Sequence, residues 1–230
     1  MSETAPKTEL MRSLGRLVRG LSALFWGLPI ALVVCVQTTS TNWIESLGHY
    51  GLIAPLLATS LLLYGLWLMS DFQKQERIWM LALDRARIPG LVNVGLSPFL
   101  HWHQQLPDVP FFHYAVSVMA LSALLFLFNL NQMLQRLTAM LPDETLREET
   151  RVFTSLNRIL LVLIPSFLAI YFTVSQIRHP PPPISFMLRV MEPASQWVLL
   201  FLILLPMAIT MSLIWKIKEA ILASVFGAEQ

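Results

Sequence analysis

The fold is decided by one apolar stretch, HYAVSVMALSALLFLFNLNQM, which occupies residues 113–133. It contains no Asp, Glu, Lys or Arg, and as a helix it would be about 30 Å long, the thickness of a bilayer's hydrocarbon core. Stretches of similar length, without a charged residue near the middle, recur at residues 20–40, 50–69, 156–177 and 195–215. The sequence therefore predicts an all-α bundle, a single transmembrane domain over residues 20–215, that crosses a membrane at least five times.

The composition supports the same class. Hydrophobic residues make up 55% of the 230 positions and charged residues only 13%, whereas about a quarter of a soluble domain is charged. In water, so many apolar side chains would form exposed patches far larger than a soluble monomer tolerates. We therefore expect the lipid bilayer as a partner, and the scattered basic residues and net charge of +2 argue against nucleic acid.

The N-terminal region has the layout of a membrane anchor. Four basic residues precede the first apolar stretch: Lys7, Arg12, Arg16 and Arg19. Residues 37–41 lack the small-x-small, Ala-type pattern of a signal-peptide cleavage site, so we expect an uncleaved anchor. Residues 1–19 form a basic amphipathic segment, which either lies on an anionic headgroup layer or extends the first helix. The lone Cys35 excludes an internal disulfide.

The number of crossings depends on the segment Ile88–Trp102, which is apolar but short. Pro89, Gly90, Gly95 and Pro98 interrupt it. It cannot extend backwards into the membrane, because Asp84, Arg85 and Arg87 would each cost about 2.5 to 3.5 kcal/mol at mid-membrane. The segment either dips into the membrane and returns, which gives five spans, or crosses it as a broken helix, which gives six.

Basic residues decide between these two topologies, because Lys and Arg are retained on the cytoplasmic side. If Ile88–Trp102 crosses, only Arg178 and Arg189 of the 16 lysines and arginines fall outside. If it does not cross, a larger set falls outside: Arg136, Arg147, Arg151, Arg158, Lys216 and Lys218. The count favours six crossings with both termini cytoplasmic. The lack of a disulfide framework and of long outer domains favours a bacterial cytoplasmic membrane.

A helical hairpin is predicted beyond the stretch at 113–133. The helical period of apolar residues continues to Leu141, and Pro142 followed by Asp143 and Glu144 is typical of a turn and a new helix start. The hairpin Arg136–Arg158 would project into the cytoplasm, and residues 216–230 would form a short tail. Charged side chains on its outer face would either dock a partner or form a solvated stalk: Arg136, Glu148 and Arg151.

Two further sets of residues are candidate sites. If Ile88–Trp102 crosses as irregular backbone, it must be shielded by the other helices, and Asn93, Gly95 and Ser97 would line the pathway of a small-solute permease or channel component. An extended His101-Trp102-His103 would place both imidazoles on one side. Together with His113, they would bind a divalent metal or a haem, or else serve as interfacial anchors.

The sequence contains none of the motifs of a P-loop nucleotide hydrolase, a zinc protease or a serine hydrolase. We therefore expect no enzyme activity and no cofactor. The leading hypothesis is a non-catalytic accessory or scaffold subunit of the cytoplasmic membrane, held to a membrane-protein partner or to a second copy of the chain. The alternatives are the permease or channel component and a metal- or haem-binding redox protein.

Overall fold

The computed structural model describes residues 4–40, 51–73, 75–141, 143–175 and 203–224, and the regular structure within these ranges is helical. The helices are α1 (Thr4–Ser40), α2 (Ile53–Met69), α3 (Arg77–Leu96), α4 (Pro98–Gln105), α5 (Pro110–Ala139) and α6 (Glu144–Ser175). A last helix occupies residues 203–224. The prediction of an all-α fold is therefore confirmed.

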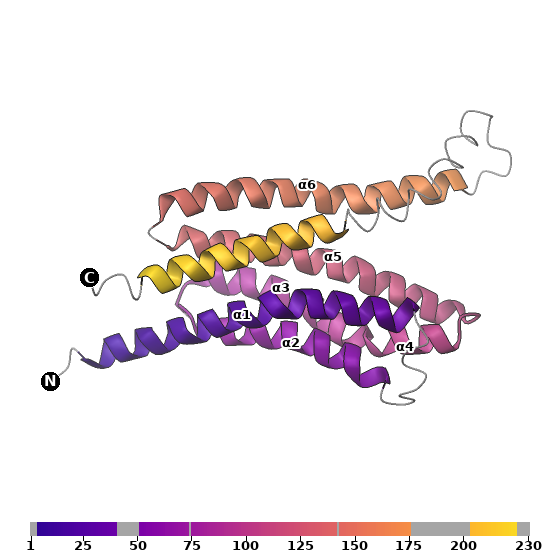
Figure 1. Cartoon of the computed structure of the whole chain (residues 1–230), viewed down its shortest axis with the longest axis horizontal. Helices are drawn as coiled ribbons and strands as arrows, with labels where there is room; N and C mark the ends of the chain where they lie inside the picture. The colour runs from indigo at the N-terminus through magenta and orange to yellow at the C-terminus, as the bar shows by residue number, and fades with distance from the viewer. Residues whose placement is uncertain (1–3, 41–50, 74, 142, 176–202, 225–230) are drawn as a thin grey trace.

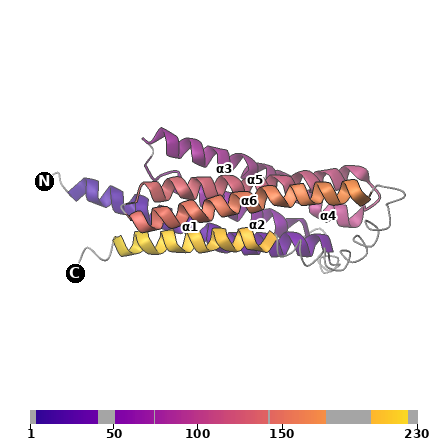
Figure 2. The same cartoon turned by 90° about the horizontal axis from the view of Figure 1, so that it is seen from above.

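The long helices lie side by side along one axis (Figure 1). One end of the molecule gathers the start of α1, the end of α2, the start of α3, the end of α5, the start of α6 and the end of the last helix. We call it the hairpin end. The opposite end contains α4 and the α4–α5 connection, and we call it the histidine end. Figure 2, seen from above, shows the same division.

Two helices are long and apolar enough to cross a bilayer. They are α1, over residues Met11–Thr39, and α5, over Pro110–Ala139. Helix α2 is also apolar but has 17 residues. These helices suggest a membrane location, while crossing by the remaining helices stays a prediction.

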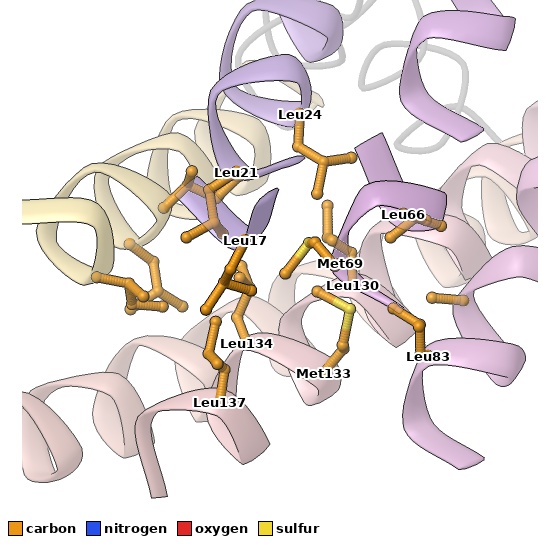
Figure 3. Packing of buried hydrophobic residues seen from close by; sticks show 14 of the residues in the cluster. Leu17, Leu21, Leu24, Leu66, Met69, Leu83, Leu130, Met133, Leu134 and Leu137 are labelled. Atoms are coloured by element: carbon orange, nitrogen blue, oxygen red, sulfur yellow. The ribbon is translucent and has the colours of Figure 1, made fainter. Parts of the chain in front are cut away.

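The apolar core is concentrated toward the hairpin end. Figure 3 shows Leu17 and Leu21 of α1 facing Met69 of α2, with Leu134 and Leu137 of α5 beside them. All five side chains are fully buried. The last helix contributes further buried side chains to the same cluster: Leu213, Ile214, Ile217 and Ile221. Residues 216–224, which were predicted as part of a tail, are thus helical and packed into the core.

Helices α1 and α2 make their closest approach at two glycines. A Cβ added at Gly20 would lie 2.7 Å from the Gly65 carbonyl oxygen, and one at Gly65 would lie 3.1 Å from the Gly20 carbonyl oxygen. Small residues at such a crossing let helix backbones pack closely, which is how helices associate without a hydrophobic driving force. The basic N-terminal segment continues into this crossing as part of α1, so it extends the first helix.

The expectation of irregular backbone at Ile88–Trp102 is wrong. Helix α3 begins at Arg77, and α4 follows it after a single residue, Ser97, whose backbone is also helical (φ −57°, ψ −33°). The predicted helix breakers serve packing instead: Pro89 and Gly90 are buried, and a Cβ at Gly90 would lie 3.4 Å from the Phe126 ring of α5. Of the three charged residues that were expected to limit the membrane-embedded length, Asp84 and Arg85 are exposed and Arg87 is half-buried.

Arg87 shows how these charges are accommodated. Its guanidinium lies 3.0 Å from the Asp84 carboxylate. It also donates to the carbonyl oxygen of Leu66, over a distance of 3.5 Å. Basic side chains commonly satisfy such carbonyl groups near the end of a helix. Arg87 therefore ties the middle of α3 to the last turn of α2.

Candidate functional site

The surface of the hairpin end is charged. The predicted docking residues Arg136 of α5 and Glu148 and Arg151 of α6 are all exposed. Two ion pairs connect helices here: Arg16 of α1 with Asp71, just after α2, and Lys216 of the last helix with Glu149 of α6, at 2.6 Å. The exposed side chains are available to a partner, while the ion pairs join helices that are distant in sequence.

A groove of about 230 Å³ lies between the start of α6 and the last helix. Its walls carry the carboxylates of Asp143, Glu149 and Glu219 and the ammonium group of Lys216, and small side chains such as Ala220 leave it open. Three carboxylates against one ammonium group give the groove a negative balance. Lys216, although part of the predicted tail, belongs to this wall, which sequence reasoning did not anticipate.

Asp143 fixes the start of α6. Its Oδ1 accepts hydrogen bonds from the Thr145 hydroxyl at 2.7 Å and from the Leu146 backbone N–H at 3.1 Å. This is the N-cap arrangement, which satisfies free N–H groups in the first helical turn. The Thr145 hydroxyl, followed by the Leu146 N–H, lowers the pKa of Asp143 from its ordinary value of 3.8. The helix break therefore falls where the sequence predicts it.

The structure brings two of the three candidate metal ligands, His103 and His113, together and sets His101 apart. Because α4 is helical, His101 and His103 point to different sides, and the premise of an extended His101-Trp102-His103 is wrong. His103 lies against His113 of α5, with ring centroids 4.9 Å apart. His101 is buried, and its Nε2 lies 3.0 Å from the amide nitrogen of Gln105. Within the described residues, no group of three or more His, Cys, Asp or Glu side chains is placed to hold a metal ion.

Aromatic rings surround this corner of the histidine end. Phe99 and Trp102 of α4 pack against Phe112 of α5, with ring centroids 6.2 and 6.1 Å apart, and against each other at 5.5 Å. Such rings are typical of the interface between hydrocarbon and water, where a side chain needs both apolar and polar surroundings. The corner thus fits the interfacial-anchor alternative for Trp102 and Phe112.

The candidate pathway residues fall on two sides of α3. Asn93 and Ser97 are buried, whereas Gly95 is exposed and a Cβ added to it would meet nothing within 4 Å. Four-residue spacing places two side chains on one helix face and two-residue spacing places them on opposite sides. Only Asn93 and Ser97 can therefore line the same interior surface.

A buried polar cluster joins α5, α6 and the last helix. The amide nitrogens of Asn131 and Asn157 each donate to the Thr210 hydroxyl oxygen at 2.9 Å, and that hydroxyl donates to the Pro206 carbonyl at 2.8 Å. Asn131 is a polar side chain within the apolar stretch 113–133, and here it makes an interhelical hydrogen bond. Asn157 and Thr210 were missed, because 53 residues separate them and neither lies in a motif.

Comparison with known proteins adds no assignment to this geometry. No protein-family model, curated protein or solved structure matched the chain. The function must therefore be argued from the placement of its own residues.

Proposed function

We propose that the chain is a multi-pass protein of the bacterial cytoplasmic membrane, with six crossings, and acts as a non-catalytic accessory or scaffold subunit. The crossings would be made by α1, α2, the α3–α4 rod, α5, α6 and the last helix. The hairpin end would then lie in the cytoplasm with both termini. It would hold a membrane-protein partner or a second copy of the chain.

The distribution of charge carries this proposal. Among the described residues, Asp108 is the only Asp, Glu, Lys or Arg at the histidine end, and the others lie toward the hairpin end. Every long helix therefore has a charge-free length on the same side of the molecule. In the α3–α4 rod this length begins after Arg87 and reaches Gln105, about 27 Å of helix, close to the thickness of a hydrocarbon core.

The surface along this charge-free length is apolar. Large side chains such as Trp26, Leu57, Ile88, Leu91 and Leu121 are more than half exposed. In water, this exposed apolar surface would favour aggregation, whereas lipid tails solvate it. The same exposure leaves the charged hairpin end as the part that water and a cytoplasmic partner would contact.

The groove and the exposed charges support a docking role at the hairpin end. Asp143, Glu149 and Glu219 make the groove complementary to a basic side chain of a partner, and charge complementarity favours encounter and register. Arg136 and Arg151 present the opposite sign outside the groove. A partner with both acidic and basic side chains fits this surface.

The docking role is tested by photocrosslinking in cells. A photoreactive residue at Glu148 should give one discrete adduct, whose mass distinguishes a different protein from a second copy of the chain. The same residue at Leu121, which is 52% exposed on α5, serves as the lipid-facing control. Charge reversal at Arg136 and Arg151 should abolish the adduct.

Two outcomes of the crosslinking experiment would contradict the proposed docking role. If Glu148 yields no discrete adduct and the protein purified in mild detergent elutes as a bare monomer, the accessory or scaffold role is excluded. If the adduct persists after charge reversal and also forms at Leu121, the hairpin end is not the docking surface.

A further inference from the structure

We propose that Asn93, Ser97 and His101 form a water-binding path that enters the bundle from the histidine end, with His101 as the group that exchanges protons with this water. The inference rests on the proposed crossing of the α3–α4 rod. It does not depend on the hairpin end or on a partner.

The three side chains lie at regular intervals along one buried face of the α3–α4 rod. They are four residues apart, which places them one above another at a rise of about 6 Å. Asn93 is 6% exposed, Ser97 0% and His101 4%. A single water that hydrogen-bonds two groups spans about 5.6 Å, from two contacts of about 2.8 Å. One water would therefore span each interval.

Two polar atoms on this face, His101 Nδ1 and Asn93 Oδ1, lack hydrogen-bond partners. The Gln105 amide N–H donates to His101 Nε2 at 3.0 Å, so the ring proton of the neutral imidazole lies on Nδ1. His101 Nδ1 and Asn93 Oδ1 are both buried without a hydrogen bond. Ser97 donates its hydroxyl proton to the Val94 carbonyl at 2.9 Å, which leaves its oxygen able to accept. The face thus offers a donor at His101 and acceptors at Ser97 and Asn93.

Water would satisfy these atoms in order. A buried polar group without a partner costs about 1–3 kcal/mol, and buried waters typically bind such groups. A water between His101 and Ser97 would accept from Nδ1–H and donate to the Ser97 oxygen. A second water would connect Ser97 with Asn93 Oδ1.

His101 makes this path more than a hydration site. It is the one titratable side chain among the buried polar residues that the structure describes. Ionisable residues inside a membrane bundle are rare and mark proton relays. Uptake of a proton at Nε2 from the outer side, as the Gln105 amide turns away, and release of the Nδ1 proton to the path water leave the imidazole neutral. The reverse steps return the proton to the outer side, so His101 exchanges protons with the path water without net transfer.

Hydrogen–deuterium exchange at the imidazole Cε1–H tests the path in the unmodified full chain. Mass spectrometry of the detergent-purified protein in deuterated water reports each histidine separately. We expect His101 to exchange at a rate comparable with those of His103 and His113, despite its burial. If His101 retains its hydrogen after His103 and His113 have exchanged fully, the path is dry and the proposal is wrong.

A matched pair of variants tests the depth of the path. Asn93→His places a probe imidazole at the inner step, and Gly95→His places one on the exposed side of the same helix. Exchange at position 93 but not at the lipid-facing position 95 supports the path. The reverse order would overturn it. Should Asn93→His fail to fold, the exchange of His101 in the unmodified chain still decides, and this result is independent of any partner adduct.

Discussion

The hairpin end and the histidine end are built from the same helices, yet they bury different side chains. At the hairpin end, Leu17, Leu134 and Leu137 are fully buried in an apolar cluster. At the histidine end, α3 and α4 bury Asn93 and His101 with polar atoms that have no partner.

This difference has an energetic meaning. Close-packed apolar side chains stabilise the fold, whereas unpartnered buried polar atoms reduce its stability. Such atoms also occur elsewhere, for example at Trp79, Asn131 and Asn157, but those of Asn93 and His101 share one buried helix face with the Ser97 hydroxyl. The hairpin end is therefore the structural anchor of the molecule, and the interior of the histidine end is where we expect chemistry with water.

The largest expected effect comes from the apolar cluster. Leu137→Ala should lower the free energy of unfolding by about 3 kcal/mol, because it removes a fully buried side chain and leaves a cavity. Leu121→Ala, at an exposed position on the same helix, should change it by less than about 0.5 kcal/mol. Thermal unfolding in detergent measures both. Equal losses would show that the core is not concentrated at the hairpin end.

A second effect concerns the α1–α2 crossing. Gly20→Ala should destabilise the protein by about 1–3 kcal/mol, because the new Cβ would lie 2.7 Å from a backbone oxygen and force the helices apart. Gly95→Ala, where the Cβ meets nothing within 4 Å, should stabilise it by about 0.4–1 kcal/mol. The same unfolding measurement compares them. A neutral Gly20→Ala would contradict the close crossing.

A third comparison separates structural from non-structural polar groups. Thr210→Val should cost about 1–3 kcal/mol, because it leaves the amides of Asn131 and Asn157 without their shared acceptor. Ser97→Ala removes only a bond to its own helix and should cost less than about 0.5 kcal/mol. If Ser97→Ala proved the more destabilising, the polar face of α3–α4 would have a structural role. The proposal that this face binds a path of water would then lose support.

The smallest effect is a pH dependence at the hairpin. Because the pKa of Asp143 is lowered in the folded chain, its contribution is complete above the ordinary value of 3.8 and is lost as the pH falls through the lowered value. Asp143→Asn should flatten this acid-side loss, which hydrogen exchange of the first α6 amides between pH 5 and about 2 would detect. An unchanged acid profile would remove Asp143 as the capping group.

Local features were predictable from the sequence where neighbouring residues alone decide. The break before Glu144 depends on Pro142 and the Asp143 cap, which lie within one turn. The helical run before it follows from apolar spacing. The same reasoning failed at Pro89 and Gly90, because their contacts with α5 are tertiary. Gly90 lies close to the Phe126 ring, and the Pro89 carbonyl accepts a hydrogen bond from Ser122.

Long-range polar contacts could not be predicted from a single sequence, for the same reason. The geometry of His101 and His103 depends on whether α4 is helical, and the meeting of Asn157 with Thr210 depends on how two distant helices pack. Asn93 and Ser97 could be singled out as candidates because they are polar side chains in an apolar stretch. Their position relative to Gly95 required the helical register.

The central claim is that the α3–α4 rod crosses the membrane, and a single cysteine tests it most directly. The variant combines Cys35→Ser with Gln105→Cys, and intact cells are treated with a membrane-impermeant maleimide. Asp143→Cys and Glu219→Cys, each in the Cys35→Ser background, are the cytoplasmic controls. Six crossings predict labelling at position 105 from outside and labelling of both controls only after lysis. Protection of position 105 until lysis would contradict the account and return the chain to five spans.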